Sequence, residues 1–228
     1  MIRSSIRHIY HKAKSRIQYL KYKNEPKIFC IGRNKTGTTS IEKIFKLLDF
    51  PVGNQKKAEL LTKNVLSGSY DELYKYVKYD GVAFQDVPFS IKNIYKRLNE
   101  KFPNSKFILT VRDSPEVWYN SLTKFHSKIF GNGRLPDKND LINAKYVYPG
   151  WMWEVNRLHY KTPEDDIYNK EILIQNYIDY NNEVIDYFKD EKHKLLVINL
   201  TDKDAAEKIN AFLNAKKKLD AIPWENKT

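Results

Sequence analysis

The chain has 228 residues, a length that predicts one domain with room for a small appendage. Hydrophobic residues make up 41% of the chain and aromatic residues 14%, so the composition supports a packed core and excludes an intrinsically disordered protein. The single cysteine, Cys30, excludes an intramolecular disulfide framework and a cysteine-based metal cluster. One thiol in a chain of this size fits a reducing compartment, and we expect a cytoplasmic protein.

The positive charge is concentrated near the N-terminus. Forty Lys and Arg against 28 Asp and Glu give a net charge of +12, and residues 1–27 hold eight of the basic residues and one acid. That segment accounts for +7, which leaves +5 for the other 201 residues. Such a balance suits a nucleic-acid binder, a membrane-surface protein or an enzyme with an anionic substrate, and it does not choose among them.

Residues 1–26 have the pattern of a basic amphipathic helix. Their apolar side chains recur at spacings of three and four, and Pro26 ends the pattern. Three arrangements stay open: a helix packed on the body of the protein, a helix on the anionic inner surface of a membrane, or a flexible arm. No apolar run reaches the roughly 18–20 residues of a transmembrane helix. We therefore expect a basic arm, residues 1–26, and one domain, residues 27–228.

Strands and helices alternate through the rest of the chain. Short apolar runs predict buried strands at residues 27–32, 81–85, 107–111 and 194–200. Helices are predicted at residues 40–48, 70–78, 91–101, 115–129, 168–187 and 204–214, and turn signals predict a loop at residues 131–149. This alternation indicates an α/β fold, a single-domain parallel sheet flanked by helices.

The loop after the first strand is rich in glycine and hydroxyl side chains. Gly37 permits a close approach of the backbone to an anion, and the N–H groups at a helix N-terminus attract negative charge. We therefore predict a phosphate-binding loop; the alternative is a Thr-rich helix cap with no ligand. The candidate binding residues are Arg33, Asn34, Lys35, Thr36, Gly37, Thr38, Thr39 and Ser40.

This loop differs from the usual loop for nucleoside triphosphates. That motif places Gly-Lys-Ser/Thr after four intervening residues, and counting from Gly32 puts Thr38 where the lysine belongs. The lysine is Lys35, inside the loop. A P-loop kinase that uses Mg-ATP on a small molecule or nucleoside is therefore an alternative that the displaced lysine disfavours.

Two further strand ends carry candidate residues. Arg112 follows the third strand, where open α/β sheets bind ligands, and its planar fork suits a phosphate. Asp86 follows the second strand and is a candidate general base; the alternative is that it caps the following helix. His126, on the predicted helix 115–129, is the competing base. The histidines have no metal-ligand spacing, and we expect no metal site.

The sequence resembles the sulfotransferases that use 3′-phosphoadenosine 5′-phosphosulfate (PAPS), in particular compact bacterial ones with a P-loop-like fold. The resemblance rests on Lys35-Thr36-Gly37-Thr38-Thr39-Ser40, which looks like the family's 5′-phosphosulfate loop, and on Arg112-Asp113-Ser114-Pro115-Glu116 followed by Trp118. It covers residues from about 27 to 228 and implies PAPS as the sulfuryl donor, with the nucleotide PAP as product.

The resemblance also implies roles for single residues. Arg112 and Ser121, or Asn120 in place of Ser121, would bind the 3′-phosphate, and Lys227 in the C-terminal loop would lie near it. Asp86 aligns with the catalytic histidine of the cytosolic sulfotransferases, and the resemblance makes Lys35 and Asp86 catalytic.

The acceptor is the least determined part of the prediction. The resemblance implies a hydroxyl or amine of a small molecule, glycan or glycolipid. Aromatic residues cluster within residues 127–170, where they stack on an acceptor or pack in the core: Tyr146, Tyr148, Trp151, Trp153 and Tyr160. A third possibility is a basic adaptor for nucleic acid or a membrane surface. The charge of +5 outside residues 1–27 disfavours it for the domain, so we expect no nucleic-acid partner.

Overall fold

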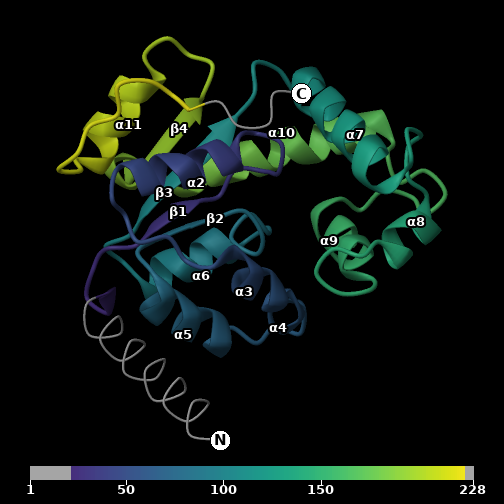
Figure 1. Ribbon diagram of the computed structural model, residues 1–228, viewed down its shortest axis with the longest axis horizontal. Coiled ribbons are helices and arrows are strands. Elements are labelled where there is room, and N and C mark those ends of the chain that lie inside the picture. The colour runs from purple at the N-terminus through teal and green to yellow at the C-terminus, as the bar shows by residue number, and fades with distance from the viewer. Residues whose placement is uncertain (1–21, 224–228) are drawn as a thin grey trace, which may run out of the picture.

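The computed structural model describes residues 22–223, so most of the predicted N-terminal helix and Lys227 lie outside the described residues. Its centre is a parallel four-stranded sheet in the order β2-β1-β3-β4, which confirms the predicted α/β fold (Figure 1). The strands are β1 (Ile28–Cys30), β2 (Ala83–Gln85), β3 (Lys106–Val111) and β4 (Leu195–Asn199). Each overlaps a predicted strand, because short apolar runs form the strands of a parallel sheet that helices cover.

Helices connect and cover the strands. Six of them correspond to predicted helices: α2 (Thr38–Leu47), α5 (Asp71–Asp80), α6 (Ile94–Lys101), α7 (Pro115–Phe130), α10 (Lys170–Tyr187) and α11 (Ala205–Leu213). The others are α3 (Gln55–Leu60), α4 (Thr62–Leu66), α8 (Lys138–Asn143) and α9 (Trp151–His159), with a short 3-10 turn at Lys192–Lys194. None of the described helices is long and apolar enough to span a membrane.

The prediction of a loop at residues 131–149 is wrong in part, because α8 forms inside it. Asp137 begins this helix with a capping box: its side chain accepts a bond from the Asp140 N–H (2.9 Å), and the Asp140 carboxylate accepts one from the Asp137 N–H (2.8 Å). Leu141 is fully buried on its inner face. A capping box and one buried apolar residue thus hold a helix too short to show a period in the sequence.

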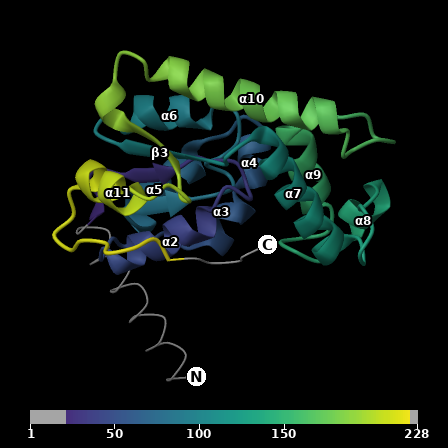
Figure 2. The ribbon, with the colours of Figure 1, turned by 90° about the horizontal axis from the view of Figure 1, so that it is seen from above.

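The two faces of the sheet are covered by different helices, as Figure 2 shows from above: α2 and α11 lie on one side of the strands, α6 and α10 on the other. Alternate residues of β1 divide between the two cores, because successive strand side chains point to opposite faces. Cys30 packs with α2 and α11, and Phe29 with α5, α6 and α10. Cys30 is thus a buried strand residue, as the apolar pattern around it predicts.

The strand order creates a crevice at the carboxyl edge of the sheet. From β1 the chain passes to β2 on one side, and from β3 it passes to β4 on the other. The segments that follow β1 and β3 therefore separate at this edge, and such a switch point is where open α/β sheets bind ligands. Helices α7, α8 and α9 lie together at one end of the molecule in Figures 1 and 2.

Candidate active site

The loop between β1 and α2 has a fixed and unusual backbone. Gly37 begins α2 in the left-handed region, with φ 102°, and Lys35 has φ 66°. A Cβ atom at Gly32 would lie 2.0 Å from Thr110 Oγ1 and 2.7 Å from the Thr110 carbonyl oxygen, so only glycine fits there without a shift of β3. Glycine at positions 32 and 37 thus allows the loop to turn tightly against the sheet edge.

Several predicted binding residues use their side chains to hold the loop. Buried Arg33 donates from its guanidinium to the Ser90 carbonyl (3.0 Å) and stacks over the Tyr180 ring at 3.8 Å. Thr36 is also buried; its hydroxyl donates to the Arg33 carbonyl (2.6 Å) and lies 2.5 Å from Thr110 Oγ1. These contacts fix the loop before any ligand binds.

Asn34 attaches the loop to two aromatic residues from other parts of the chain. Its carbonyl accepts a bond from the Trp118 indole N–H (3.0 Å), and its side-chain oxygen accepts one from the Tyr160 hydroxyl (2.9 Å). Trp118 is fully buried and stacks on Tyr177, with ring centroids 4.5 Å apart. The tryptophan after Arg-Asp-Ser-Pro-Glu therefore supports the loop from α7.

Lys35 and Arg112 lie together at the crevice between β1 and β3. The Arg112 Nε–H donates to the Lys35 carbonyl (2.7 Å), and the Arg112 backbone N–H donates to the Tyr177 hydroxyl (3.0 Å). The Lys35 ammonium lies 4.0 Å from the centroid of the Phe125 ring. Burial lowers the pKa of Lys35, and the neighbouring Arg112 charge lowers it further. The two cations are thus held at the sheet edge by fixed contacts.

The Asp113 side chain bonds to the end of β4. Its carboxylate accepts hydrogen bonds from the Asn199 side-chain amide and from the Thr201 hydroxyl (3.0 Å). Asp113 therefore connects the end of β3 to the end of β4, whereas the Arg112 guanidinium bonds to the β1–α2 loop.

Asp86 occupies the end of β2, next to the start of α2. One carboxylate oxygen accepts a bond from the Thr38 hydroxyl (3.1 Å), and the other accepts one from the Val87 N–H (2.9 Å). Its backbone is left-handed, with φ 61°. Burial raises the pKa of Asp86, while the two hydrogen bonds and Lys35 oppose the rise. Asp86 does not cap the next helix, because α6 begins later in the chain, with Asn93 as its first flanking residue.

His126 and Ser121 lie on α7. Buried His126 shares a hydrogen bond of 2.7 Å between Nδ1 and the Tyr168 hydroxyl, and burial lowers its pKa to about 3. It is therefore a neutral imidazole near pH 7. Ser121 is buried, whereas Asn120 is exposed on the same helix.

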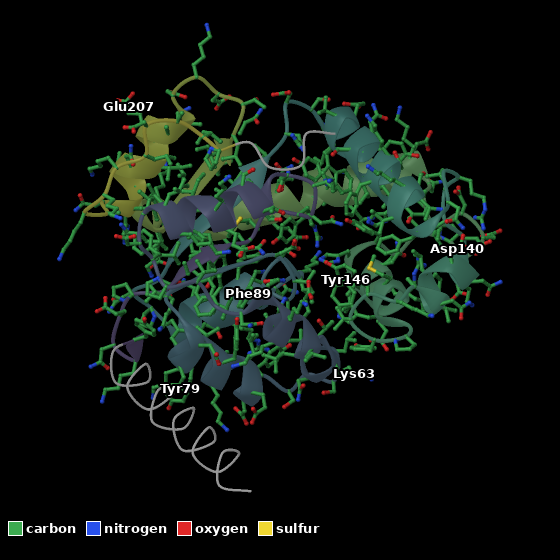
Figure 3. The ribbon with its side chains drawn as sticks, viewed as in Figure 1. Lys63, Tyr79, Phe89, Asp140, Tyr146 and Glu207 are labelled. Carbon is green, nitrogen blue, oxygen red and sulfur yellow. The ribbon has the colours of Figure 1, made fainter. Side chains whose placement is uncertain are left out.

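Most of the candidate residues meet at one cavity of about 270 Å³. Candidates from all three strand ends and from α7 line it: Asn34, Lys35, Gly37, Thr38, Thr39, Asp86, Arg112 and His126. The other candidates in residues 22–223 are buried and are not among its lining residues: Arg33, Thr36, Ser40 and Ser121. Figure 3 labels Tyr146, one of the aromatic residues of its wall, beside the α8–α9 part of the chain on the side that faces the sheet.

Two titratable residues of this cavity were not predicted. Glu59 on α3 is 9% exposed, and burial raises its pKa to about 7. His159 on α9 is 6% exposed, and burial lowers its pKa well below the ordinary value. Neither belongs to a recognisable motif; Asn54, which caps α3 by accepting a bond from the Lys57 N–H (3.1 Å), was the available signal for the helix that carries Glu59.

The chain was compared with known proteins. A family model described as a sulfotransferase domain matches residues 27–228. A search of curated proteins found no match to the chain.

Proposed function

The chain belongs to the sulfotransferase family, and from this premise we propose that it moves a sulfuryl group from PAPS to a hydroxyl or amino group of a small-molecule acceptor. One observation carries the proposal: Lys35, Asp86 and Arg112, from three different strand ends, line a single cavity at the switch point of the sheet. Two cations suit an anionic donor, and the Asp86 carboxylate suits an acceptor that must lose a proton.

The donor side of the site is assigned to the loop and to Arg112. Backbone N–H groups at the start of α2 favour a phosphate, because they carry the positive end of the helix dipole. The hydroxyls of Thr36 and Thr38 are already engaged within the protein, so the backbone and Lys35 bind the 5′-phosphosulfate. Arg112 keeps its terminal N–H groups for the 3′-phosphate after Nε–H has bonded to the loop. Ser121, and Lys227 beyond the described residues, complete this assignment.

The reaction is an in-line transfer in which Asp86 is the base. The acceptor oxygen bonds to sulfur while the bond between sulfur and the bridging phosphate oxygen breaks, and PAP leaves. The acceptor proton passes to the Asp86 carboxylate, and Lys35 neutralises the charge that grows on the bridging oxygen. Asp86 is favoured over His126, because a pKa of about 3 makes that imidazole a poor proton acceptor.

Binding of nucleotides tests this proposal against a kinase. We expect calorimetric titration with PAP to give binding that does not change when Mg²⁺ is removed by a chelator, and weaker binding of ATP with or without Mg²⁺. The 3′-phosphate distinguishes the two nucleotides, so Arg112→Ala should reduce the preference for PAP. Tight binding of Mg-ATP together with no binding of PAP would overturn the proposal and favour the kinase.

The cytoplasmic location, the membrane contact of residues 1–26 and a glycan or glycolipid as acceptor stay predictions. Vesicle sedimentation with anionic lipids, comparing the full chain with a variant lacking residues 1–21, addresses the second of these.

A further inference from the structure

The acceptor side of the cavity has a charge that the proposed donor does not use. When PAPS binds as proposed above, its phosphates engage Lys35 and Arg112, and Asp86 is already bonded to Thr38 and Val87. Glu59 is the remaining charged residue among those that line the cavity. The inference below therefore rests on the proposed function and concerns its acceptor.

The buried carboxylate of Glu59 accepts only a weak hydrogen bond from the protein. Its hydrogen bond to the Gln55 side-chain amide is long, at 3.4 Å, and that amide also donates to the Val87 carbonyl at 2.8 Å. Salt bridges in the described part of the chain do not include Glu59. Ionising a carboxylate that is buried without a salt bridge is costly, so a cation that binds at this position gains more than it would at the surface.

His159 lines the same cavity, but its ring nitrogens face the protein. Its Nδ1 lies 3.1 Å from the Val155 carbonyl, so this nitrogen donates. Nε2 is fully buried, and the Ser90 backbone also interacts with the ring, so a molecule in the cavity does not reach this nitrogen. Glu59 is therefore the hydrogen-bond acceptor of the cavity that the protein leaves without a strong donor.

The nature of the missing donor follows from the carboxylate of Glu59. A hydroxyl group offers it only one hydrogen, whereas an ammonium group offers three hydrogens and a positive charge. The wall beside Glu59 contains the rings of Tyr146 and Trp151, 5.3 Å apart between centroids, and aromatic rings attract cations. A carboxylate or phosphate on the acceptor would be repelled by Glu59 and Asp86.

We propose that the acceptor is an amino alcohol: its hydroxyl faces Asp86, and its ammonium group binds the Glu59 carboxylate beside the rings of Tyr146 and Trp151. Glu59 is thus the residue that selects acceptors by charge. The cavity of about 270 Å³ also receives the reacting end of the donor, so compact acceptors are the suitable probes.

Three ring alcohols of one shape test the proposal with the PAP-saturated protein. The probes are trans-4-aminocyclohexanol, trans-4-methylcyclohexanol and trans-4-hydroxycyclohexanecarboxylate, and their binding is measured by calorimetry and by ligand NMR. We expect the amino alcohol to bind the wild-type protein at least 10-fold more tightly than the other two, a difference of about 1.4 kcal/mol. Glu59→Gln keeps the shape and the bond to Gln55, and should reduce the preference to less than about twofold.

A matched control separates a site effect from a general charge effect. Glu72→Gln removes an exposed carboxylate from α5, and should leave the preference unchanged. Equal binding of the three probes, no measurable binding of the amino alcohol, or a preference that persists in Glu59→Gln would each overturn the inference. PAP titration of every variant measures binding at the proposed donor side separately. Normal PAP binding without a preference for the amino alcohol would refute the acceptor class but would not contradict the proposed sulfuryl transfer.

Discussion

Replacing Asp86 by asparagine removes the proposed base while keeping the shape of the site. Asparagine suits this position because the backbone has φ 61°, a conformation that Asn and Asp adopt more readily than other non-glycine residues. The side-chain oxygen can still accept from the Val87 N–H, and the new amide can donate to the Thr38 hydroxyl. An alanine at this position would mix the loss of the base with backbone strain of about 1–2 kcal/mol.

The expected effect is confined to the chemical step. Loss of a positioned base reduces turnover by about 10²–10⁴-fold, which corresponds to about 3–5 kcal/mol of barrier. The assay is the single-turnover release of PAP, with the acceptor that the wild-type protein converts fastest in a panel of alcohols and amines. We expect PAP affinity to change by less than about twofold, because Asp86 does not belong to the proposed donor contacts. Asp179→Asn, an exposed change on α10, is the control.

Stability gives an independent measurement on the same variant. Burial raises the pKa of Asp86, so the folded state binds this proton more tightly than the unfolded state does. Ionisation then costs stability as the pH rises above about 4, and the asparagine variant is free of this cost. The melting temperature of Asp86→Asn minus that of the wild type should therefore grow between pH 4 and pH 7. Turnover above one-tenth of the wild-type rate would refute the assignment of the base, and a constant difference in melting temperature would refute the buried, high-pKa carboxyl.

Two more predictions concern lysines. Lys35→Ala should abolish transfer, because no other side chain of the β1–α2 loop brings a cation into the cavity, whereas Lys124→Ala, an exposed change on α7, should keep it. PAP release under saturating PAPS measures both variants, and normal turnover by Lys35→Ala would contradict the role of the loop. Lys27 is buried with its ammonium on the carbonyls of Tyr22 (2.7 Å) and Gly81 (2.9 Å), and burial lowers its pKa to about 8. The unfolded state binds this proton more tightly than the folded state, so the free energy of unfolding of the wild type should rise by about 1 kcal/mol relative to that of Lys27→Met between pH 7 and pH 9. Urea denaturation measures this difference, and a difference that does not change with pH would contradict the lowered pKa.

The strands were predictable because the signal for them is local. The run Phe107-Ile108-Leu109 is fully buried in β3, and fully buried parallel strands need only such a short apolar run with turn residues around it. The short helices α3 and α4 were not predicted, because five or six residues show no helical period. Their stability comes from distant contacts, such as the bond from the Trp151 indole N–H to the Glu59 carbonyl (3.2 Å).

The proposed donor side of the site was more accessible to sequence analysis than the proposed acceptor side. Lys35, Asp86 and Arg112 each follow a predicted strand, and the carboxyl ends of parallel strands meet at one edge. Glu59 reaches the cavity from α3, which follows α2 rather than a strand, so no spacing rule relates it to the loop. A single acidic residue in a polar stretch has the same appearance whether it faces solvent or a cavity. Only the tertiary fold distinguishes the two.

The positions of the hydroxyl groups change the interpretation of the Thr-rich loop. A phosphate-binding loop is expected to offer its hydroxyls to the ligand, yet the Thr36 hydroxyl bonds to the Arg33 carbonyl and the Thr38 hydroxyl bonds to Asp86. Thr38 stands where the usual nucleotide loop has its lysine, and here it joins the proposed base to the N-terminus of α2. Because the same residue ends the proposed anion-binding loop and bonds to the carboxylate, the proposed donor site and the proposed base are held together. The lysine lies earlier in the loop, and the position that it leaves holds a hydroxyl that fixes Asp86 beside the loop. This arrangement suits the proposed removal of a proton from an acceptor next to a bound anion.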